Sequence, residues 1–200
     1  MALQLRNLAR LDEGERDAGQ ADIVRAMRAV IEDAALDDLM RRELLSMPGQ
    51  TPIMEQIDEA DPGRIFAECE ALKQAIGTAL AEPMHRLYER AEAVPFSHSA
   101  EAKGARKLKT LILVYAAASD PEKAAELAAH QYDRADNMTD RQGALMVLTG
   151  IDSAARTGRL IDFYNRYQGN ALVIDKWFTL QAMSLHPHVI EHVKALAEHE

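Results

Sequence analysis

The chain has 200 residues, and its 32 acidic side chains outnumber its 23 basic ones, which gives a formal net charge of −9 at pH 7. A chain of this length buries enough surface to fold without disulfides or a structural metal. The negative charge disfavours a nucleic acid or an anionic membrane as a partner, because both bind basic surfaces. The single cysteine excludes a disulfide framework and a cysteine-based zinc finger.

The sequence lacks the features of a membrane span or a secretory signal. No apolar run approaches the roughly 20 residues that a span requires. Residues 1–16 carry charges in every turn, whereas a signal peptide has an uninterrupted apolar centre. These observations predict a cytoplasmic protein whose partners include neither a membrane nor a nucleic acid.

Apolar residues recur with helical spacing through the first half of the chain. After a leading helix or arm over 1–19, stripes run over 23–31, 36–44, 65–80 and 84–88. The segment 47–52 contains two prolines and a glycine, which predicts a break. Asp61-Pro62 predicts a helix start. An Asp side chain accepts hydrogen bonds from the free N–H groups of the first turn, and Pro at the first helical position lacks an N–H that would have no partner there. Residues 94–99 are predicted to form a loop.

The second half of the chain continues the same pattern. Apolar stripes run over 108–115, 124–132, 144–148, 160–167, 173–180 and 189–196. Asp120-Pro121 is another predicted helix start. Thr139, with Gln142 three residues later, has the form of a capping box. Pro187 is expected to open the last helix, with Val189, Val193 and Leu196 facing inward.

These elements predict about ten helices and no strand, each helix with one apolar stripe and short connections. Such a row of helices makes either a bundle or an α-solenoid. We expect an all-α fold, an irregular α–α superhelix of ARM/HEAT-like repeats over residues 1–200 as one domain. A globular bundle is the second choice.

Few residues point to chemistry. The chain has no glycine-rich phosphate loop and no G-x-S-x-G nucleophile elbow. The basic stretch of Lys103, Arg106, Lys107 and Lys109 is interpreted as a solvated helix face rather than a phosphate site. Cys69 lies among apolar residues at helical spacing, which predicts a buried, inert thiol. Three isolated histidines are expected at the surface or core edge: His85, His98 and His130.

The segment from His188 to His192 reads H-x-x-E-H, the inverted zincin pattern. Residues four apart converge on one helix face, so two imidazoles could reach one metal ion. A catalytic zinc also needs a third protein ligand, and only Glu198, His199 and Glu200 follow at the end of the chain. The favoured alternative is the solvent-exposed face of a terminal helix.

Two stretches are more specific than a plain helical array requires. In residues 132–141 an aromatic residue, an Asp-Asn pair and Thr139 indicate a tight, capped turn between helices. Residues 173–182 hold the only tryptophan, Trp177, beside Asp175, Lys176 and Gln181. A packed tryptophan with a satisfied polar rim explains this second stretch structurally, and ligand contacts are the alternative in both.

The strings Asp136-Asn137-Met138-Thr139-Asp140 and Asp175-Lys176-Trp177-Phe178-x-Leu180-Gln181-Ala182 together resemble the C-terminal helical domain of bacterial aminopeptidase N, the alanyl branch of the zinc gluzincins. Two further segments resemble the same domain: the helix end at Leu45-Ser46-Met47-Pro48 and the helix restart at 57–62. Order and spacing match from about Gln20 to the end of the chain.

The resemblance implies a parent enzyme that removes N-terminal residues from peptides. Its zinc, held by H-E-x-x-H and a downstream Glu, and its G-A-M-E-N substrate motif belong to an earlier catalytic domain. Neither motif occurs here, so no catalytic or metal-binding residue is carried over and this piece needs no cofactor of its own. The family continues beyond this chain with further helices, which implies an excised piece.

In the family this domain walls a closed cavity around the active site, so the implied partners are the catalytic domain of the parent chain and peptide substrates. The motif positions are then expected to serve packing or the cavity wall: Asp136, Asn137, Met138, Thr139, Asp140, Asp175, Lys176, Trp177 and Gln181. The alternative hypothesis is a freestanding helical-repeat scaffold that binds a protein in its concave groove.

Overall fold

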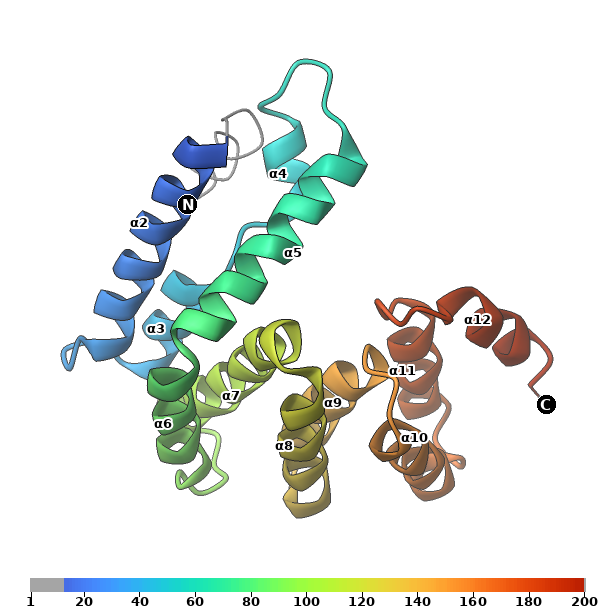
Figure 1. Cartoon of the computed structure of the whole chain (residues 1–200). Helices are drawn as coiled ribbons and strands as arrows, with labels where there is room; N and C mark the ends of the chain where they lie inside the picture. Colours follow the sequence, from blue (N-terminus) through green and yellow to red (C-terminus); the bar gives the residue numbers. More distant parts are fainter. Residues whose placement is uncertain (1–12, 200) are drawn as a thin grey trace. The chain divides into compact units, whose positions relative to one another are not determined.

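The computed structural model describes residues 13–199, and all the regular structure in this range is helical. The helices are α2 (Glu13–Glu32), α3 (Asp38–Leu45), α4 (Gln50–Met54), α5 (Pro62–Ala79), α6 (Ala81–Glu92), α7 (Ala100–Ser119), α8 (Pro121–Arg134), α9 (Met138–Thr149), α10 (Ala154–Tyr167), α11 (Ala171–Ala182) and α12 (Val189–Ala197) (Figure 1). The predicted all-α fold of helical repeats is confirmed. None of these helices combines the length and apolar character that a membrane span requires.

The chain divides into two compact units, unit 1 over residues 1–119 and unit 2 over residues 120–200. The prediction of one domain over 1–200 stays a prediction. Residues 1–12 of the predicted leading arm lie outside the described residues, and residues 13–19 belong to α2.

Unit 1 is organised around α7, which packs against α3, α5 and α6. Two glycines allow helix backbones to approach closely. A Cβ on Gly77 of α5 would lie 2.3 Å from the carbonyl oxygen of Tyr115, and one on Gly104 of α7 would lie 2.8 Å from the amide nitrogen of Leu39. The core is mainly aliphatic, and its most buried members include Ile23, Met27, Leu45, Leu72, Ile76, Leu80, Leu108 and Leu113.

Unit 2 is built from helices that pack mostly on their nearest neighbours in sequence. α8 packs on α9 and α10, α10 packs on α9 and α11, α11 also contacts α9, and α12 packs on α11 (Figure 1). The innermost side chains are Tyr132, Ala144, Leu145, Leu148 and Phe163. This stepwise contact pattern is what a helical-repeat architecture produces.

The Asp-Pro helix starts are confirmed, but the predicted capping box is wrong. Asp61 accepts a hydrogen bond from the Arg64 amide at 3.1 Å, and Asp120 does the same for α8. In α9 the capping residue is Asn137, whose side chain accepts from the Asp140 amide at 2.9 Å. The extended backbone that a cap needs occurs at Asn137, so Thr139 is not the cap. Thr139 lies inside the helix and its side chain is exposed.

Arginine side chains bind the free carbonyl groups at several helix ends. No glycine among the described residues has a positive φ, so no helix end there uses a left-handed glycine. The pairs are Arg28 with the Ala79 carbonyl, Arg41 with Val30 and Asp33, Arg141 with Ala135, and Arg156 with Thr149. A cation at a helix C-terminus also interacts favourably with the helix dipole. Arginines, of which Arg41 and Arg156 are buried, therefore help to fix where successive helices turn.

Burial corrects one surface prediction and supports others. The basic stretch in α7 is a solvated face only at Lys103 and Lys107, whereas Arg106 and Lys109 are buried. The Arg106 guanidinium donates to the Ser97 carbonyl at 3.0 Å and lies over the Phe96 ring. Cys69 is buried as predicted, and burial raises the pKa of its thiol. The isolated histidines at 85, 98 and 130 are exposed.

The last helix begins later and packs less than predicted. α12 starts at Val189 with His188 as its capping position, because Pro187 lies in the preceding turn. Val189 and Leu196 are half-buried, but Val193 is 40% exposed, so the prediction that it faces inward is wrong. α11 is the helix on which α12 packs among the described residues, and no residue of α12 is fully buried.

Candidate functional site

The first family string forms the corner between α8 and α9. Asn137 caps α9 and its amide nitrogen donates to the carboxylates of Asp136 and Asp140, each at 2.9 Å. Asp140 is buried, and its backbone carbonyl accepts a hydrogen bond from the Gln131 side chain at 2.9 Å. Met138 is half-buried and Asp136 is exposed. The string therefore builds a turn whose polar groups bind one another.

The second family string lies on α11 and divides into an inner and an outer part. The indole N–H of Trp177 donates to the Leu160 carbonyl at 2.9 Å, which ties α11 to α10. Gln181 is buried one turn later and donates to the Trp177 carbonyl at 3.1 Å. Asp175 and Lys176 are exposed. The inner residues serve packing, and the outer pair is open to solvent.

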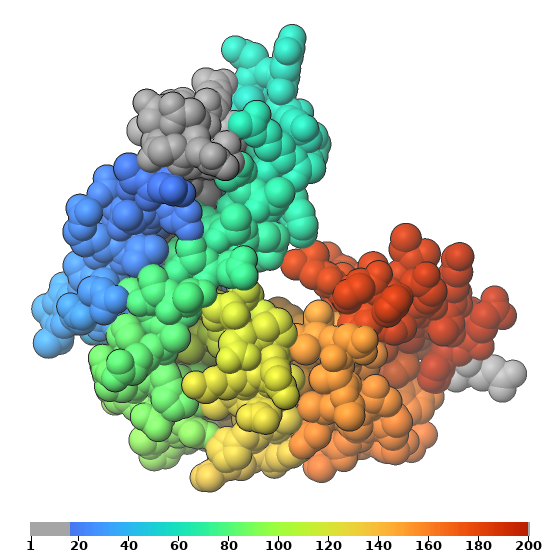
Figure 2. All heavy atoms as spheres, in the orientation of Figure 1, coloured from blue at the N-terminus to red at the C-terminus, as the bar shows by residue number. Residues whose placement is uncertain are grey.

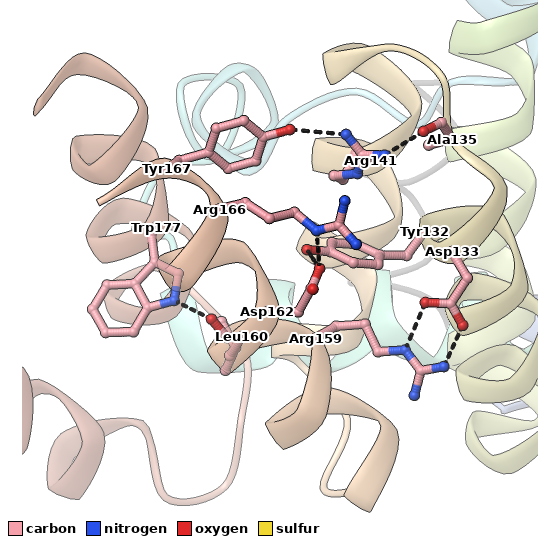
Figure 3. Close-up of polar contacts among 10 residues, drawn as sticks. All are labelled: Tyr132, Asp133, Ala135, Arg141, Arg159, Leu160, Asp162, Arg166, Tyr167 and Trp177. Carbon is pink, nitrogen blue, oxygen red and sulfur yellow. Dashed lines mark hydrogen bonds and ion pairs between the residues drawn. The ribbon is translucent and has the colours of Figure 1, made fainter. Parts of the chain in front are cut away.

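A network of polar side chains joins the same corner to α10, and the sequence reasoning missed most of it (Figure 3). Arg141 donates to the Tyr167 hydroxyl at 2.8 Å, and its guanidinium lies 5.8 Å from the centre of the Tyr132 ring. The Tyr132 hydroxyl donates to Asp162 at 2.8 Å, and Arg166 donates to the same carboxylate oxygen at 2.6 Å.

One further ion pair lies beside this network, between Arg159 of α10 and Asp133 of α8, with a shortest N–O distance of 2.5 Å (Figure 3). Its two parallel hydrogen bonds give the pair a defined geometry. Aromatic and charged residues spaced at a helix corner were the only signal in the sequence. The partners in α10 could not be assigned because they come from a different helix.

The network shifts the ionisation of its members. Burial raises the pKa of Tyr132, and the neighbouring Asp162 adds to the rise. Burial also raises the pKa of Asp162, but hydrogen bonds from Arg166 and Tyr132 outweigh it, and the net pKa is lowered. The carboxylate therefore stays charged and the phenol stays protonated near neutral pH. The carboxylates of Asp133 and Asp162 are each paired with an arginine, which suits a rigid helix junction rather than acid–base catalysis.

The H-x-x-E-H segment does not form a zincin face. His188 is the exposed residue before α12, and His192 is half-buried with its Nδ1 atom 2.9 Å from the Arg156 guanidinium. The alternative of a solvent-exposed face holds for His188 and is wrong for His192. The described residues contain no group of three or more histidine, cysteine or carboxylate side chains arranged to hold a metal ion.

The sequence reasoning also missed His186, which is only 3% exposed. Its ring lies 4.5 Å from that of His192 between ring centres, and its Nδ1 atom accepts a hydrogen bond from the His188 amide at 3.1 Å. The histidines at 186, 188 and 192 were a signal in the sequence, but Arg156, which contacts His192, lies 36 residues before it.

This fold and these motif positions define an ARM-type helical-repeat domain. A family described as "Domain of unknown function (DUF3458_C) ARM repeats" matches residues 1–200. The chain belongs to this family.

Curated relatives extend the likeness. The chain is 30% identical over 193 residues to aminopeptidase N of Escherichia coli, which covers 96% of the chain and 22% of that protein. It is 31% identical over 175 residues to aminopeptidase N of Caulobacter vibrioides, covering 86% of the chain and 20% of that protein. The chain therefore spans about a fifth of the length of these relatives, and it matches their C-terminal helical region.

A solved structure supports the fold. Aminopeptidase A of Legionella pneumophila, crystallised with aspartic acid, superposes with a TM-score of 0.75 at 22% identity. The match covers 98% of this chain and 27% of that one.

Proposed function

We propose that the chain is the non-catalytic C-terminal helical domain of a zinc-dependent aminopeptidase, where it walls and gates the cavity around the active site. The observation that carries this proposal is the alignment with aminopeptidase N, which spans 96% of the chain but 22% of the relative. The parent enzyme removes N-terminal residues from peptides in the cytoplasm. Its zinc lies in the catalytic domain, which is the partner of this chain.

The roles of the motif residues support a wall rather than a reaction centre. Asn137 and Asp140 bind each other at the α8–α9 corner, and the Trp177 indole N–H links α11 to α10 by a hydrogen bond. Groups that bind one another in this way hold helices at set angles. A rigid wall limits entry to small or unfolded peptides and excludes bulk water from the zinc site.

The mass of the native gene product provides the first test. Antiserum against this chain is expected to detect a band several times heavier than the 22.2 kDa of the 200 residues. A band at 22.2 kDa would overturn the proposal and leave the freestanding scaffold, whose partner a pull-down would then identify.

The division of labour between the two parts provides the second test. The purified chain is expected neither to cleave an alanyl chromogenic substrate nor to retain stoichiometric zinc after dialysis, whereas the parent protein does both. Turnover by the purified chain would contradict a purely structural role.

Gating is tested separately, with substrates of increasing length. The parent protein is expected to have a kcat/KM that falls steeply from tripeptides to folded proteins with accessible N-termini. Removal of this domain should flatten that dependence, and adding the purified chain back should restore it. If the truncated enzyme cleaves tripeptides normally and keeps its full discrimination against folded proteins, the gating role is wrong.

A further inference from the structure

Two histidines meet at the point where α12 joins the rest of unit 2. His186 lies in the α11–α12 connection and His192 lies on α12, with their ring centres 4.5 Å apart. Arg156 of α10 lies beside them, with its guanidinium bound to His192 and to the Thr149 carbonyl at the end of α9. His186 and Arg156 are buried at 3% and 8% exposure. Through the Arg156 side chain the cluster links α9, α10 and α12 of unit 2.

The hydrogen bonds of this cluster require both rings to be neutral. A guanidinium group can only donate, so the Nδ1 atom of His192 accepts from Arg156. A backbone amide can only donate, so the Nδ1 atom of His186 accepts from the His188 amide. Each neutral ring therefore carries its proton on Nε2. Protonation would add a hydrogen to each Nδ1 atom, directed at a group that is itself a donor, and would break both contacts.

The positive charges around the cluster also oppose protonation. Arg156 of α10 and His188 of the connection lower the pKa of both rings, and His192 also lowers the pKa of His186. The opposing carboxylates are Asp152, which precedes α10, and Glu191 of α12. Asp152 lies 3.8 Å from the Nε2 atom of His186, too far for a hydrogen bond, and is 78% exposed to water. Burial is the largest cause that lowers the pKa of both rings, and Arg156 is the second.

The remaining contacts of α12 are weak. None of its residues is fully buried, and its backbone packs on α11 in the described part of unit 2. In Figure 2 the red spheres of this region are not covered by other parts of unit 2 on the face drawn. Elements with few buried contacts are the first to open locally, so a small change in the cluster has a large effect here.

We propose that His186, His192 and Arg156 form a pH-sensitive latch, which holds α12 against α10 and α11 while both rings are neutral and releases it on acidification. Release uncovers the edge of Trp177, because His199 after α12 contacts its ring at 5.2 Å between centres. The inference concerns unit 2 alone and does not depend on the proposed aminopeptidase role.

The direction and the ceiling of the effect follow from linkage. A histidine with a lowered pKa in the docked state takes up protons on release, so docking is favoured above pH 6.5 and weakens as the pH falls below it. A ring that stays neutral when docked and titrates normally when released shifts the docking equilibrium about thirtyfold between pH 7.5 and 5.0. Two such rings multiply the effect.

Hydrogen exchange on the full chain measures the latch directly. Amide protection in peptides covering residues 189–199 is compared at pH 7.5 and 5.0, after correction for the intrinsic exchange rates. We expect protection to fall more than about fivefold, with a ceiling of about thirtyfold per histidine. Peptides from α8 and α9 serve as the internal reference and should change less than twofold.

The variants His192→Asn and His186→Asn separate the latch from a general acid effect. Asn keeps an oxygen acceptor near the position of Nδ1 but does not titrate. We expect each variant to lose part of the pH dependence, with protection at pH 7.5 within a fewfold of the parent chain. His188→Asn is the comparison variant, because His188 is exposed and its hydrogen bond to His186 uses only its backbone amide, although its charge also helps to lower the pKa of both rings.

His199 is kept in every variant, because its ring contacts those of Tyr164 and Trp177. The His188→Asn variant should keep most of the pH dependence. A change below twofold in the parent chain overturns the latch. So does an equal loss of protection in α8 and α9, or an unchanged pH dependence in both His192→Asn and His186→Asn. If His186→Asn does not fold, His192→Asn alone decides.

Discussion

The two units of the chain hold their helices together in different ways. In unit 1 the helices approach closely around α7, and glycines at 77 and 104 leave no room for a side chain. In unit 2 the helices are joined by polar corners, in which arginine, aspartate and tyrosine side chains bind one another. The comparison teaches that similar helical repeats tolerate change differently. A new side chain at a close backbone contact forces two helices apart, whereas a change in a polar corner removes one hydrogen bond and leaves the others in place.

The largest effect is expected for Gly77→Ala in unit 1. The new Cβ would lie 2.3 Å from the Tyr115 carbonyl oxygen and 2.8 Å from the Ser119 hydroxyl. The first of these is a backbone atom, so α5 and α7 must separate. We expect a loss of about 2–3 kcal/mol in the free energy of unfolding, after the helix propensity gained by alanine. Urea denaturation followed by circular dichroism measures it.

Gly158→Ala in unit 2 is the matched control. Gly158 lies within α10, and a Cβ there meets no atom of the described residues within 4 Å. We expect this variant to gain up to about 1 kcal/mol, since alanine favours a helix more than glycine does. Equal destabilisation by the two variants would mean that close backbone contact is not what distinguishes unit 1.

The next largest effect is the difference in stability loss between Tyr115→Phe in unit 1 and Tyr132→Phe in unit 2. Tyr115 donates at 2.6 Å to the carbonyl of Leu45, which ends α3 and has no partner within its own helix. Tyr115→Phe leaves that buried oxygen unsatisfied, and we expect a cost of about 1–3 kcal/mol. Tyr132→Phe should lower the free energy of unfolding by less than about 1 kcal/mol. The Asp162 carboxylate still accepts a hydrogen bond from Arg166 in this variant and remains in contact with water. Urea midpoints in the reverse order would contradict the comparison.

Most of the fold could be predicted from local patterns. The Asp61-Pro62 and Asp120-Pro121 starts depend on neighbouring residues, so the sequence contains the whole signal. The predicted cap at Thr139 was wrong because two candidate caps lie two residues apart, and the backbone conformation decides between them. Arg106 was predicted to be solvated, but its partner at Ser97 lies in a loop whose path the sequence does not specify.

The candidate site could be predicted only in part. The family strings identified Trp177 and Gln181, which are buried, together with Asp175 and Lys176, which are exposed. A string comparison does not separate inner from outer positions when the helix is apolar on more than one side. The partners Arg156 and His186 were missed, because contacts between different helices depend on packing angles that periodicity does not contain.

A smaller effect tests the corrected cap of α9. Asn137→Ala removes the acceptor for the Asp140 amide and the donor to two carboxylates. We expect a loss of about 1 kcal/mol, the ordinary value of a helix cap. Thr139→Ala, at an exposed position two residues later, should change stability by less than about 0.5 kcal/mol. The fluorescence of Trp177, the only tryptophan, reports the unfolding of unit 2 in both variants.

The smallest effect depends on pH and tests whether the polar corner acts through charge. Hydrogen bonds from Arg166 and Tyr132 lower the pKa of Asp162 below its ordinary value of 3.8, despite the opposing effect of burial. A lowered pKa means that the unfolded chain binds the proton more readily. The stabilisation is therefore complete above pH 3.8 and is lost as the pH falls through the folded-state value.

We expect Asp162→Asn to unfold at a slightly lower urea concentration than the parent chain at pH 6, by less than Asn137→Ala does. The two midpoints should begin to converge as the pH falls below 3.8, because the unfolded parent chain then takes up the proton more readily than the folded one and the advantage of the carboxylate shrinks. Arg166→Gln should reproduce part of the difference, since that guanidinium donates at 2.6 Å to the same oxygen as Tyr132. A difference that does not shrink as the pH falls below 3.8 would show that shape, and not charge, makes the corner stable.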